Sequence, residues 1–434
     1  MGSSILTASF RRSGENNALH CEGVPLARIA ETVGTPVFVY SSAEIRLQYE
    51  KLKGALEGIP HRIHYSVKAN SSLGVLAVLR ELGAGVDIVS GGELHRALLA
   101  GFTGDDVVFS GVGKTAPEIR EALRAGVRFF NVESEGELRA IDALASEDGL
   151  IAPVAIRVNP EVDVDTPHEY TRTGGRGHKF GIPYDEAEAV ALLATELANV
   201  RLVGLDMHVG SQLTRMEPYE RGVARLLDLV ELLPSRARAD LRWLDLGGGL
   251  AVPYDVDDDK VDLGAFAAVA RRAARSSGLE LVIEPGRFLV ANAGVLVTRV
   301  LYRKRSGGKD YVIADAGMTE LLRPSHYHAH HGVERVEEPH RAEIETADVV
   351  DVVGPVCESG DFLALDRKLA SVEPGDLLAI LSAGAYAYVM ASNYNSRQKP
   401  PEVLVDGNRF GVVTDRETRD DLTRLERTVP AWRE

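Results

Sequence analysis

Lys68 is the first residue of the chain that could do covalent chemistry. It follows a run of alternating and β-branched residues, Ile63–Val67, which predicts a strand, and it precedes the polar loop Asn70–Ser72. An uncharged lysine amine attacks carbonyl carbons and forms Schiff bases. Because a lone lysine at a strand end is more often a solvated surface residue, its role depends on the groups that the fold brings near it.

A second pair of motifs could bind phosphate. Gly247, Gly248 and Gly249 follow one predicted strand, and Gly286 and Arg287 follow the next. Glycine loops leave backbone N–H groups accessible to an anion, and an arginine can add a charge-assisted hydrogen bond. Two such loops on neighbouring strands predict a phosphate site.

A phosphate site beside a reactive lysine predicts pyridoxal 5'-phosphate as the cofactor. Its ring nitrogen needs a carboxylate, which Glu284 could supply, and its ring face needs a flat group, which His208 could supply. Each residue also has a purely structural explanation, because His208 could be a core histidine and Glu284 a cap at a strand end. Their combination with Lys68 favours the cofactor.

Eight apolar runs separated by helix-like stretches are the elements that must position these residues. The pattern is typical of an α/β fold, a (β/α)8 barrel, whose active-site residues lie at the carboxyl ends of the strands. The predicted strands are Ile63–Val67, Gly85–Val89, Val107–Phe109, Arg128–Val132, Val154–Val158, Leu202–His208, Leu241–Leu246 and Leu279–Ile283. A doubly wound open sheet is the alternative, but no early GxGxxG motif supports its switch point.

After about residue 290, short extended runs replace the alternation and predict a second, mostly β domain that resembles a Greek-key barrel. Its predicted strands are Val295–Tyr302, Asp310–Ala314, Val349–Val353, Phe362–Leu365, Leu377–Leu381, Ala385–Met390 and Glu402–Val405. We therefore expect an N-terminal segment (1–35) that packs with the β domain, a barrel domain (36–288) and a C-terminal β domain (289–434).

Composition argues against several classes of function. The 434 residues carry a net charge of -15, with acidic residues spread along the chain, which argues against nucleic-acid or anionic-membrane partners. The chain has no signal-like segment and no run of eighteen apolar residues, and Cys21 and Cys357 fit a reducing cytoplasm. The histidine-rich stretch His326–His331 lacks supporting cysteines or carboxylates, so we expect no metal site.

Two sets of motifs resemble known enzymes. The first set resembles the fold-type III pyridoxal-phosphate decarboxylases and comprises Tyr65–Asn70, His208–Gln212, Leu246–Leu250 and Glu284–Arg287. The second set resembles, more narrowly, the diaminopimelate decarboxylase family and comprises Asp315–Met318, Arg323–Tyr327, Val356–Asp361 and Gly384–Tyr386. The resemblance covers roughly residues 25 to 415, in order and in both predicted domains.

That resemblance implies a role for each motif. Lys68 would hold the cofactor covalently, Glu284 would pair with its ring nitrogen, and His208 would cover its ring. The other cofactor contacts would come from Ser211, Gly247, Gly248, Gly249, Gly286, Arg287 and Tyr386. Cys357 would protonate the carbanion that decarboxylation leaves. In this family it reaches the site of the neighbouring subunit together with Glu358, so a homodimer with shared active sites is implied.

The resemblance also implies the substrate, meso-2,6-diaminopimelate, which loses CO2 to give L-lysine in the last step of lysine biosynthesis. Its distal carboxylate would contact Arg287, Arg323 and Tyr327, its distal ammonium would contact Glu358, and Tyr386 would complete the substrate site. A simple diamine precursor has no distal carboxylate and would leave Arg323 without a ligand.

Other functions stay open at this point. One is decarboxylation of D-ornithine, D-lysine or a carrier-tethered glutamyl group; another is a non-catalytic pyridoxal-phosphate-binding relative. Silent relatives tend to lose the lysine or the cysteine, whereas Lys68 and Cys357 are both present. A racemase of the alanine type would need a tyrosine base in place of Cys357 and Glu358. The segment Asp165–Gly174 departs from the family pattern, which leaves the fine substrate choice undecided.

Overall fold

The computed structural model describes residues 5–14, 17–162, 175, 177–337, 347–430 and 432–433. Its contacts divide the chain into two compact units. The first, which we call the strand-rich unit, comprises Met1–Glu44, Tyr254–Val256 and Asn292–Glu434. The second, the barrel unit, comprises Ile45–Pro253 and Asp257–Ala291.

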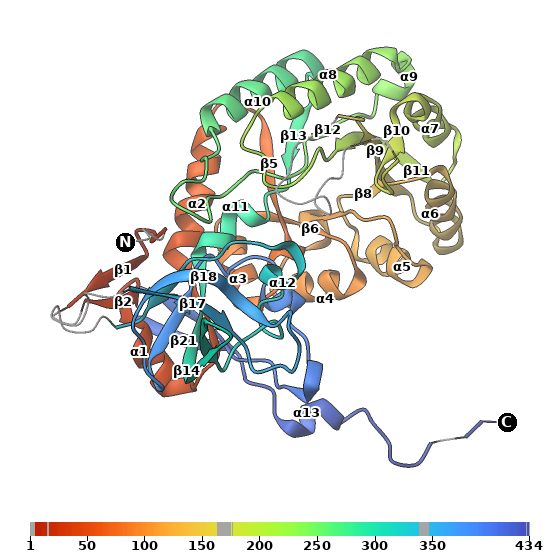
Figure 1. Ribbon diagram of the computed structural model, residues 1–434. Coiled ribbons are helices and arrows are strands. Elements are labelled where there is room, and N and C mark those ends of the chain that lie inside the picture. The colour runs from red at the N-terminus through yellow and green to blue at the C-terminus, as the bar shows by residue number, and fades with distance from the viewer. Residues whose placement is uncertain are drawn as a thin grey trace. The chain divides into compact units, whose positions relative to one another are not determined.

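The barrel unit is a closed ring of eight parallel strands (Figure 1). In order around the ring they are β5 (His61–Ser66), β6 (Gly85–Ile88), β7 (Val107–Phe109), β8 (Phe129–Val132), β9 (Ala152–Asn159), β11 (Val200–Met207), β12 (Trp243–Asp245) and β13 (Glu280–Ile283). The ring closes because β13 pairs in parallel with β5. The predicted barrel is therefore confirmed, and the open doubly wound sheet is excluded. The short strand β10 (Ile182–Pro183) adds to β9.

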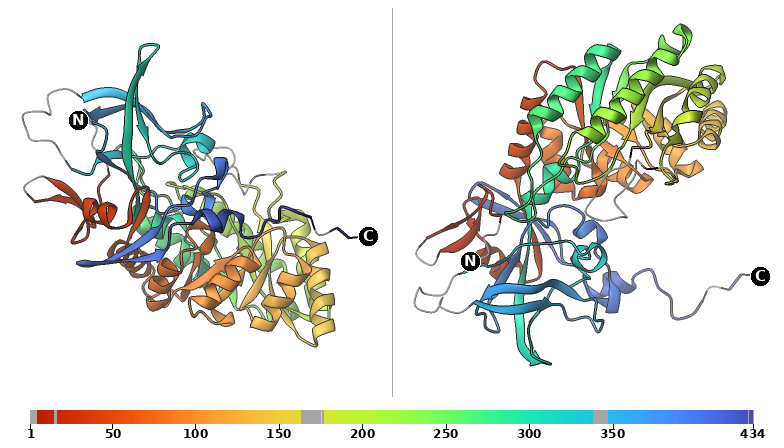
Figure 2. Two further views of the ribbon diagram at one scale, coloured as in Figure 1. Left: turned by 90° about the horizontal axis from the view of Figure 1, so that it is seen from below. Right: turned by 45° about the horizontal axis from the view of Figure 1, so that its top comes forward.

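Helices follow the strands and surround the ring, as the views of Figure 2 show. They are α2 (Ser42–Ala55), α3 (Leu73–Glu81), α4 (Gly91–Leu99), α5 (Ala116–Ala125), α6 (Glu135–Asp148), α7 (Tyr184–Glu196), α8 (Glu217–Leu232), α9 (Ser235–Arg238), α10 (Leu263–Ser277) and α11 (Arg287–Val290). Several begin at a side-chain cap; the Ser90 hydroxyl, for example, accepts a hydrogen bond from the Glu93 N–H. None of the helices in the described part of the chain combines the length and apolar character needed to cross a bilayer.

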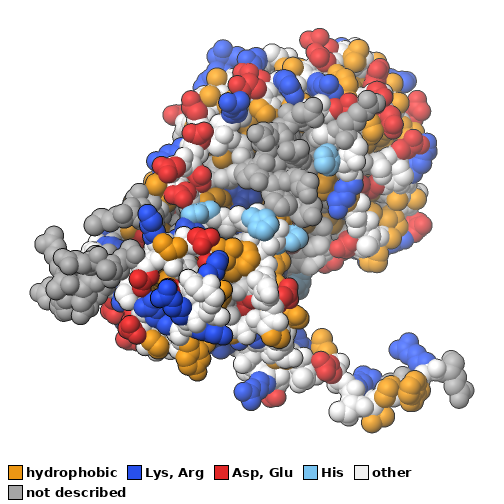
Figure 3. All heavy atoms as spheres, viewed as in Figure 1, with side chains coloured by type: hydrophobic (Ala, Val, Ile, Leu, Met, Phe, Trp, Pro, Cys, Tyr) orange, Lys and Arg blue, Asp and Glu red, His pale blue; other side chains and the backbone are white. Residues whose placement is uncertain are grey.

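The barrel interior explains why its strands read as apolar runs. Both faces of each strand are covered, so Val108, Phe129, Ala155 and Val282 pack into one buried cluster. Outside, acidic and basic side chains are interspersed over the face seen in Figure 3. This fits a negative charge that is spread along the chain.

The strand-rich unit is built on a long sheet with the order β18-β17-β15-β14-β4-β20-β21. β19 pairs with β14, and β16 pairs with β19. The bounds are β4 (Val37–Ser41), β14 (Gly294–Ser306), β15 (Lys309–Ala314), β16 (Val333–Arg335), β17 (Ala347–Val353), β18 (Phe362–Ala370), β19 (Leu377–Ile380), β20 (Glu402–Asp406) and β21 (Arg409–Thr414). Helices α12 (Arg323–Tyr327) and α13 (Arg419–Thr423) are short. The predicted strand Ala385–Met390 is wrong, because Ser382 and Tyr386 have positive φ angles (55° and 56°) that interrupt an extended backbone.

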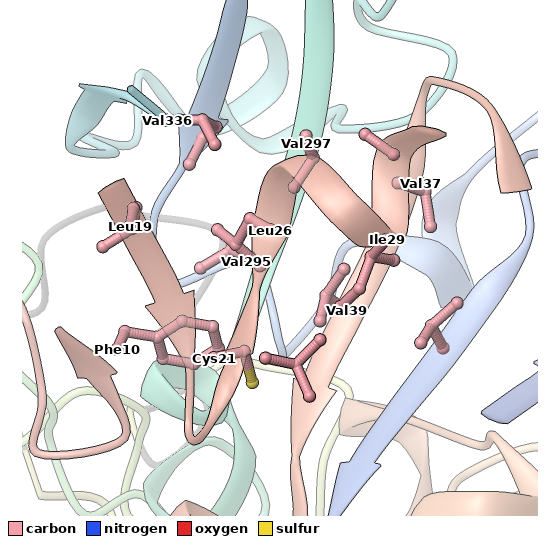
Figure 4. Packing of buried hydrophobic residues seen from close by; sticks show 14 of the residues in the cluster. Phe10, Leu19, Cys21, Leu26, Ile29, Val37, Val39, Val295, Val297 and Val336 are labelled. Carbon is pink, nitrogen blue, oxygen red and sulfur yellow. The ribbon is translucent and has the colours of Figure 1, made fainter. Parts of the chain in front are cut away.

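The N-terminal segment packs on this sheet. It forms β1 (Phe10–Ser13), β2 (Ala18–Cys21), β3 (Val24–Pro25) and helix α1 (Leu26–Val33). Figure 4 shows Phe10, Leu26 and Ile29 in one buried cluster with Val295 and Val297 of β14. The division into units also differs from the boundary expected at residue 36, because β4 pairs with β14 and β20.

One buried histidine makes stability depend on pH. His64 of β5 is 1% exposed, and burial lowers its pKa to about 4. The unfolded chain binds a proton there at an ordinary pKa near 6.5, so between pH 4 and 6.5 the unfolded state holds more protons and stability falls as pH falls. We expect His64 to lower the free energy of unfolding by about 2 kcal/mol between pH 7 and pH 5.

Urea unfolding of the wild type and of His64→Asn at both pH values measures this effect. The asparagine cannot titrate, so the variant should lose less stability on acidification, whatever its stability at pH 7. Equal losses in the two proteins would contradict the assignment to His64.

Candidate active site

Lys68 lies in a short 3-10 turn, Val67–Ala69, that follows β5. Its Nζ donates to the Asp87 Oδ2 on β6 at 2.8 Å, and the Ser66 hydroxyl donates to the same oxygen at 2.9 Å. Burial alone would raise the pKa of Asp87, but the Lys68 ammonium and its hydrogen bond hold that pKa below its usual value. The Lys68 side chain is 39% exposed, so the ion pair fixes the amine and leaves it accessible.

Glu284 follows β13 and is buried. Its Oε1 accepts hydrogen bonds from Asn131 at 3.3 Å and from Ser110 at 3.4 Å. Burial, followed by the nearby charge of Asp87, raises the pKa of Glu284 to about 7. A cationic ring nitrogen placed beside this carboxyl would favour its ionised form. The Ser66 hydroxyl oxygen, which bonds Asp87, also lies 3.0 Å from the Glu284 carbonyl oxygen, so Glu284 lies close to the Lys68 turn.

Two buried acids beside Glu284 were not predicted. Asp206 is the second-last residue of β11, and Asp245 is the last residue of β12. One carboxylate oxygen of each lies within 4.8 Å of a carboxylate oxygen of Glu284. Burial, then the Glu284 charge, raises the pKa of both well above the usual value. Arg157 of β9 lies 3.7 Å from Asp206 and also pairs with Glu133. The sequence does contain a signal for these two acids, because each is an acidic residue in an apolar strand that is buried on both faces.

His208 directly follows β11. Its Nδ1 accepts a hydrogen bond from the Gly248 N–H at 3.3 Å, and burial, with help from the Arg157 charge, lowers its pKa to about 3. The imidazole is therefore neutral at physiological pH. A neutral, flat ring beside the glycine loop is suited to covering an aromatic cofactor.

The glycine triplet forms a cradle that no side chain could enter. A Cβ on Gly248 would lie 2.1 Å from the Glu284 carbonyl, and one on Gly249 would lie 2.1 Å from the Gly210 carbonyl. Gly249 also has a φ of +103°, which L side chains rarely adopt. The Tyr219 hydroxyl donates to the Gly248 carbonyl at 2.6 Å and fixes the loop from behind.

The remaining barrel residues lie at the same strand ends. Arg287 donates to the Ser211 hydroxyl at 3.2 Å, which joins the loop after β13 to the loop after β11. A Cβ on Gly286 would lie 3.1 Å from Ser66 and from Ala69, so this loop lies against the Lys68 turn. Shared contacts thus connect every predicted barrel residue from Lys68 to Arg287.

The other predicted site residues belong to the strand-rich unit. Cys357 is exposed, and the Asn395 amide lies 3.5 Å from its sulfur. The turn that carries Cys357 and Glu358 is organised by Asp361, whose carboxylate accepts from the N–H groups of Val356 and Met318 at 2.6 Å each. These hydrogen bonds fix the turn that carries the Cys357 thiol.

Tyr386 and Arg323 are held by different means. Tyr386 is half-buried with a φ of 56°, a strained conformation for a tyrosine that often marks a functional position. Arg323 is the buried first residue of α12, and Tyr327 is the last residue of the same helix. The ring of Tyr327 packs edge-on against His326 at 4.5 Å.

The histidines of 326–331 point to different partners. His330 lies 3.3 Å from Asp255 and 2.9 Å from Arg367, whereas His331 lies 2.8 Å from Arg323. Within the described ranges they form no group of three metal ligands, and such a group occurs only at Asp206, Asp245 and Glu284. The unusual segment 165–174 lies outside the described residues.

Comparison with known proteins decides the family. Residues 42–291 match the family model described as "Pyridoxal-dependent decarboxylase, pyridoxal binding domain". A diaminopimelate decarboxylase of Pseudomonas aeruginosa is 51% identical over 412 residues, which cover 95% of this chain and 97% of the relative. The chain belongs to the diaminopimelate decarboxylase family.

Solved structures of the diaminopimelate decarboxylase family share the fold. The enzyme of Helicobacter pylori, complexed with L-lysine, is 39% identical with a TM-score of 0.87, and the match covers 92% of this chain and 99% of that one. The enzyme of M. jannaschii, also in complex with L-lysine, is 34% identical with a TM-score of 0.89, covering 98% and 99%.

The barrel residues of this diaminopimelate decarboxylase family member fit pyridoxal phosphate. The glycine triplet puts no side chain at the strand ends where the phosphate would bind, and a Cβ on Gly248 or Gly249 would collide with a neighbouring loop. An accessible lysine amine, a buried carboxyl and a neutral imidazole are the three side-chain types that the cofactor's carbonyl, ring nitrogen and ring face need. Lys68, Glu284 and His208 would hold these parts, and Ser211 and Arg287 would stand beside the phosphate.

Proposed function

We propose that the protein is a carboxy-lyase that converts meso-2,6-diaminopimelate into L-lysine and CO2 with pyridoxal 5'-phosphate. The observation that carries the proposal is the connected set of contacts from Lys68 through Asp87, Ser66 and Glu284 to the glycine cradle, in a chain of this family. Incubating the purified protein with meso-diaminopimelate and following CO2 and L-lysine tests it directly. Release of product only from D-ornithine or D-lysine would favour the alternative decarboxylase.

The chemistry divides between the cofactor and the chain. When bound, pyridoxal phosphate supplies an electron-poor ring that takes up the electron pair of the breaking bond to the carboxylate. Lys68 would provide the amine for the cofactor's carbonyl, and Asp87 holds that amine at the strand end. Glu284 would pair with the ring nitrogen, His208 would cover the ring, and the Sγ of Cys357 would supply the proton for the reacting carbon.

Substrate choice rests on the end of diaminopimelate that does not react. Arg323, Arg287 and Tyr327 receive the distal carboxylate, Glu358 receives the distal ammonium, and Tyr386 completes the pocket. Arg323 gives the clearest distinction between substrates, because a planar guanidinium matches a carboxylate and has no counterpart in a diamine precursor.

Arg323→Ala should raise the KM for meso-diaminopimelate by roughly a hundredfold, which corresponds to losing a charge-assisted contact in a buried site. It should change kcat/KM for D-lysine, which lacks the distal carboxylate, by little. Steady-state kinetics on both substrates measures the contrast. An equal loss with both substrates would contradict the assignment of Arg323 to the distal carboxylate.

We also propose that the protein works as a homodimer with shared active sites, in which Cys357 and Glu358 serve the Lys68 of the other subunit. The exposure of Cys357 on a turn fixed by Asp361 supports this arrangement. We also propose that the protein acts in the reducing cytoplasm, where free cysteines such as its two are the norm.

Mixing two inactive variants tests the sharing. In an equal mixture of Lys68→Ala and Cys357→Ala that has exchanged subunits, half of the dimers are mixed, and each mixed dimer has one complete site. Activity should therefore recover to about a quarter of the wild type. Each variant taken through the same exchange alone is the control, and no recovery in the mixture would count against shared sites.

A further inference from the structure

Arg323 is held on two sides by side chains of the strand-rich unit. Its Nη1 lies 2.8 Å from the Nε2 of His331, and its Cζ lies 4.5 Å from the centre of the Tyr254 ring. The rings of Tyr254 and His331 meet edge to face at 5.5 Å. These three side chains, which we call the Arg323 clamp, are all buried.

The chemistry of arginine fixes the protonation of His331. A guanidinium donates hydrogen bonds and accepts none, so the Nε2 of His331 must be the acceptor in this pair. The proton of the neutral ring is then on Nδ1, which donates to the Leu381 carbonyl at 2.8 Å. Both ring nitrogens are thus used, and the imidazole has a single orientation.

The backbone around His331 is equally well fixed. Val333 pairs with Ile380 in the β16–β19 ladder, and the Leu381 N–H donates to the Gly332 carbonyl at 2.8 Å. The Leu381 carbonyl that orients His331 therefore belongs to a paired strand end. Because His331 is 0% exposed, its ring cannot turn without moving this ladder.

We propose that His331, as the neutral Nδ1–H tautomer, is a positioning residue that sets the plane of the Arg323 guanidinium for the substrate's distal carboxylate. Tyr254 supports the face of that plane. This inference rests on the proposed function, in which Arg323 receives the carboxylate. A guanidinium binds a carboxylate through two parallel hydrogen bonds only when the two groups are coplanar, so rotation of Arg323 weakens binding without changing its charge.

Binding of two ligands to the holoenzyme tests the proposal without using turnover. L-lysine and cadaverine share the chain and both amines, and only L-lysine keeps the distal carboxylate. His331→Phe keeps a ring against Tyr254 but removes the acceptor, and His331→Gln restores an acceptor near the Nε2 position. Isothermal titration should show that His331→Phe binds L-lysine about tenfold more weakly, in the range for one lost hydrogen bond to a charged group. The same variant should bind cadaverine as the wild type does. His331→Gln should recover part of the affinity for L-lysine.

The outcomes separate this proposal from the proposed function. Equal weakening of both ligands, or L-lysine binding like that of the wild type, overturns the role of His331. If Arg323→Ala binds L-lysine as the wild type does, the assignment of Arg323 itself fails. Should His331→Phe not fold, Tyr254→Leu decides, because it removes the other side of the Arg323 clamp: a selective loss of L-lysine affinity supports the proposal, and an unchanged ratio of the two affinities overturns it.

Discussion

Lys68→Ala is expected to abolish covalent attachment of pyridoxal phosphate and to lower kcat for meso-diaminopimelate by at least roughly a thousandfold. Lys68 supplies the only amine in the set of contacts that runs from Lys68 through Asp87, Ser66 and Glu284 to the glycine triplet. Its Nζ lies 2.8 Å from the Asp87 Oδ2. Lys114, a buried lysine of the same barrel, is bound to the carbonyls of Gly111 and Asn131 and to Glu137. It therefore offers no accessible amine in place of Lys68.

Lys68→Arg is the matched control for charge. It keeps a cation opposite Asp87 but offers no amine that can form the link, so it should be as inactive as the alanine variant while keeping the barrel's ion pair. Borohydride reduction followed by peptide mass spectrometry should find the cofactor's mass on the Lys68 peptide of the wild type and on no peptide of either variant. Attachment at another lysine, or activity of Lys68→Arg near that of the wild type, would refute the assignment.

The barrel could be predicted because its strands have one simple property. They are covered on both faces, so each is a short apolar run, and the polar residues at the ends of those runs meet at one mouth. Lys68, His208 and Glu284 could be grouped on that basis without knowing which strands are neighbours in space. In the structure, the loops that carry them are joined through Ser66 and Gly248.

The partner of Lys68 could not be found in the same way. Asp87 lies inside β6, between Val86 and Ile88, and a buried acid in an apolar run is ambiguous until its neighbour is known. Only the register of β6 on β5 places Asp87 opposite Ser66 and the Lys68 turn. Asp206 and Asp245 escaped prediction for the same reason, because each belongs to an apolar strand, just before the predicted site residues.

Long-range pairing also explains why the second unit was less predictable. β4 looks like a first barrel strand by position, but its partners β14 and β20 come more than two hundred residues later. The contact of Arg323 with His331 depends in turn on the pairing of β16 with β19, and β16 is only three residues long. Short strands and distant partners leave little periodic signal in the sequence.

Gly248→Ala is expected to weaken cofactor binding by at least about tenfold and to lower the free energy of unfolding of the cofactor-free protein by about 1–3 kcal/mol, the usual cost of overpacking. The new Cβ would lie 2.1 Å from the Glu284 carbonyl, so the loops after β12 and β13 would have to separate. The same Gly248 donates its N–H to His208, and its carbonyl accepts from Tyr219. One methyl group therefore disturbs the glycine triplet, His208 and the loop that carries Glu284.

Gly136→Ala is the matched control, because a Cβ on this glycine of α6 meets nothing within 4 Å. That variant should bind pyridoxal phosphate like the wild type and should be as stable or slightly more stable, since alanine is the better helix former. Urea unfolding and titration with the cofactor, followed by fluorescence, measure both quantities. If Gly248→Ala lost stability but bound the cofactor normally, the glycine triplet would serve loop packing alone, and the phosphate would have to be bound elsewhere on the barrel.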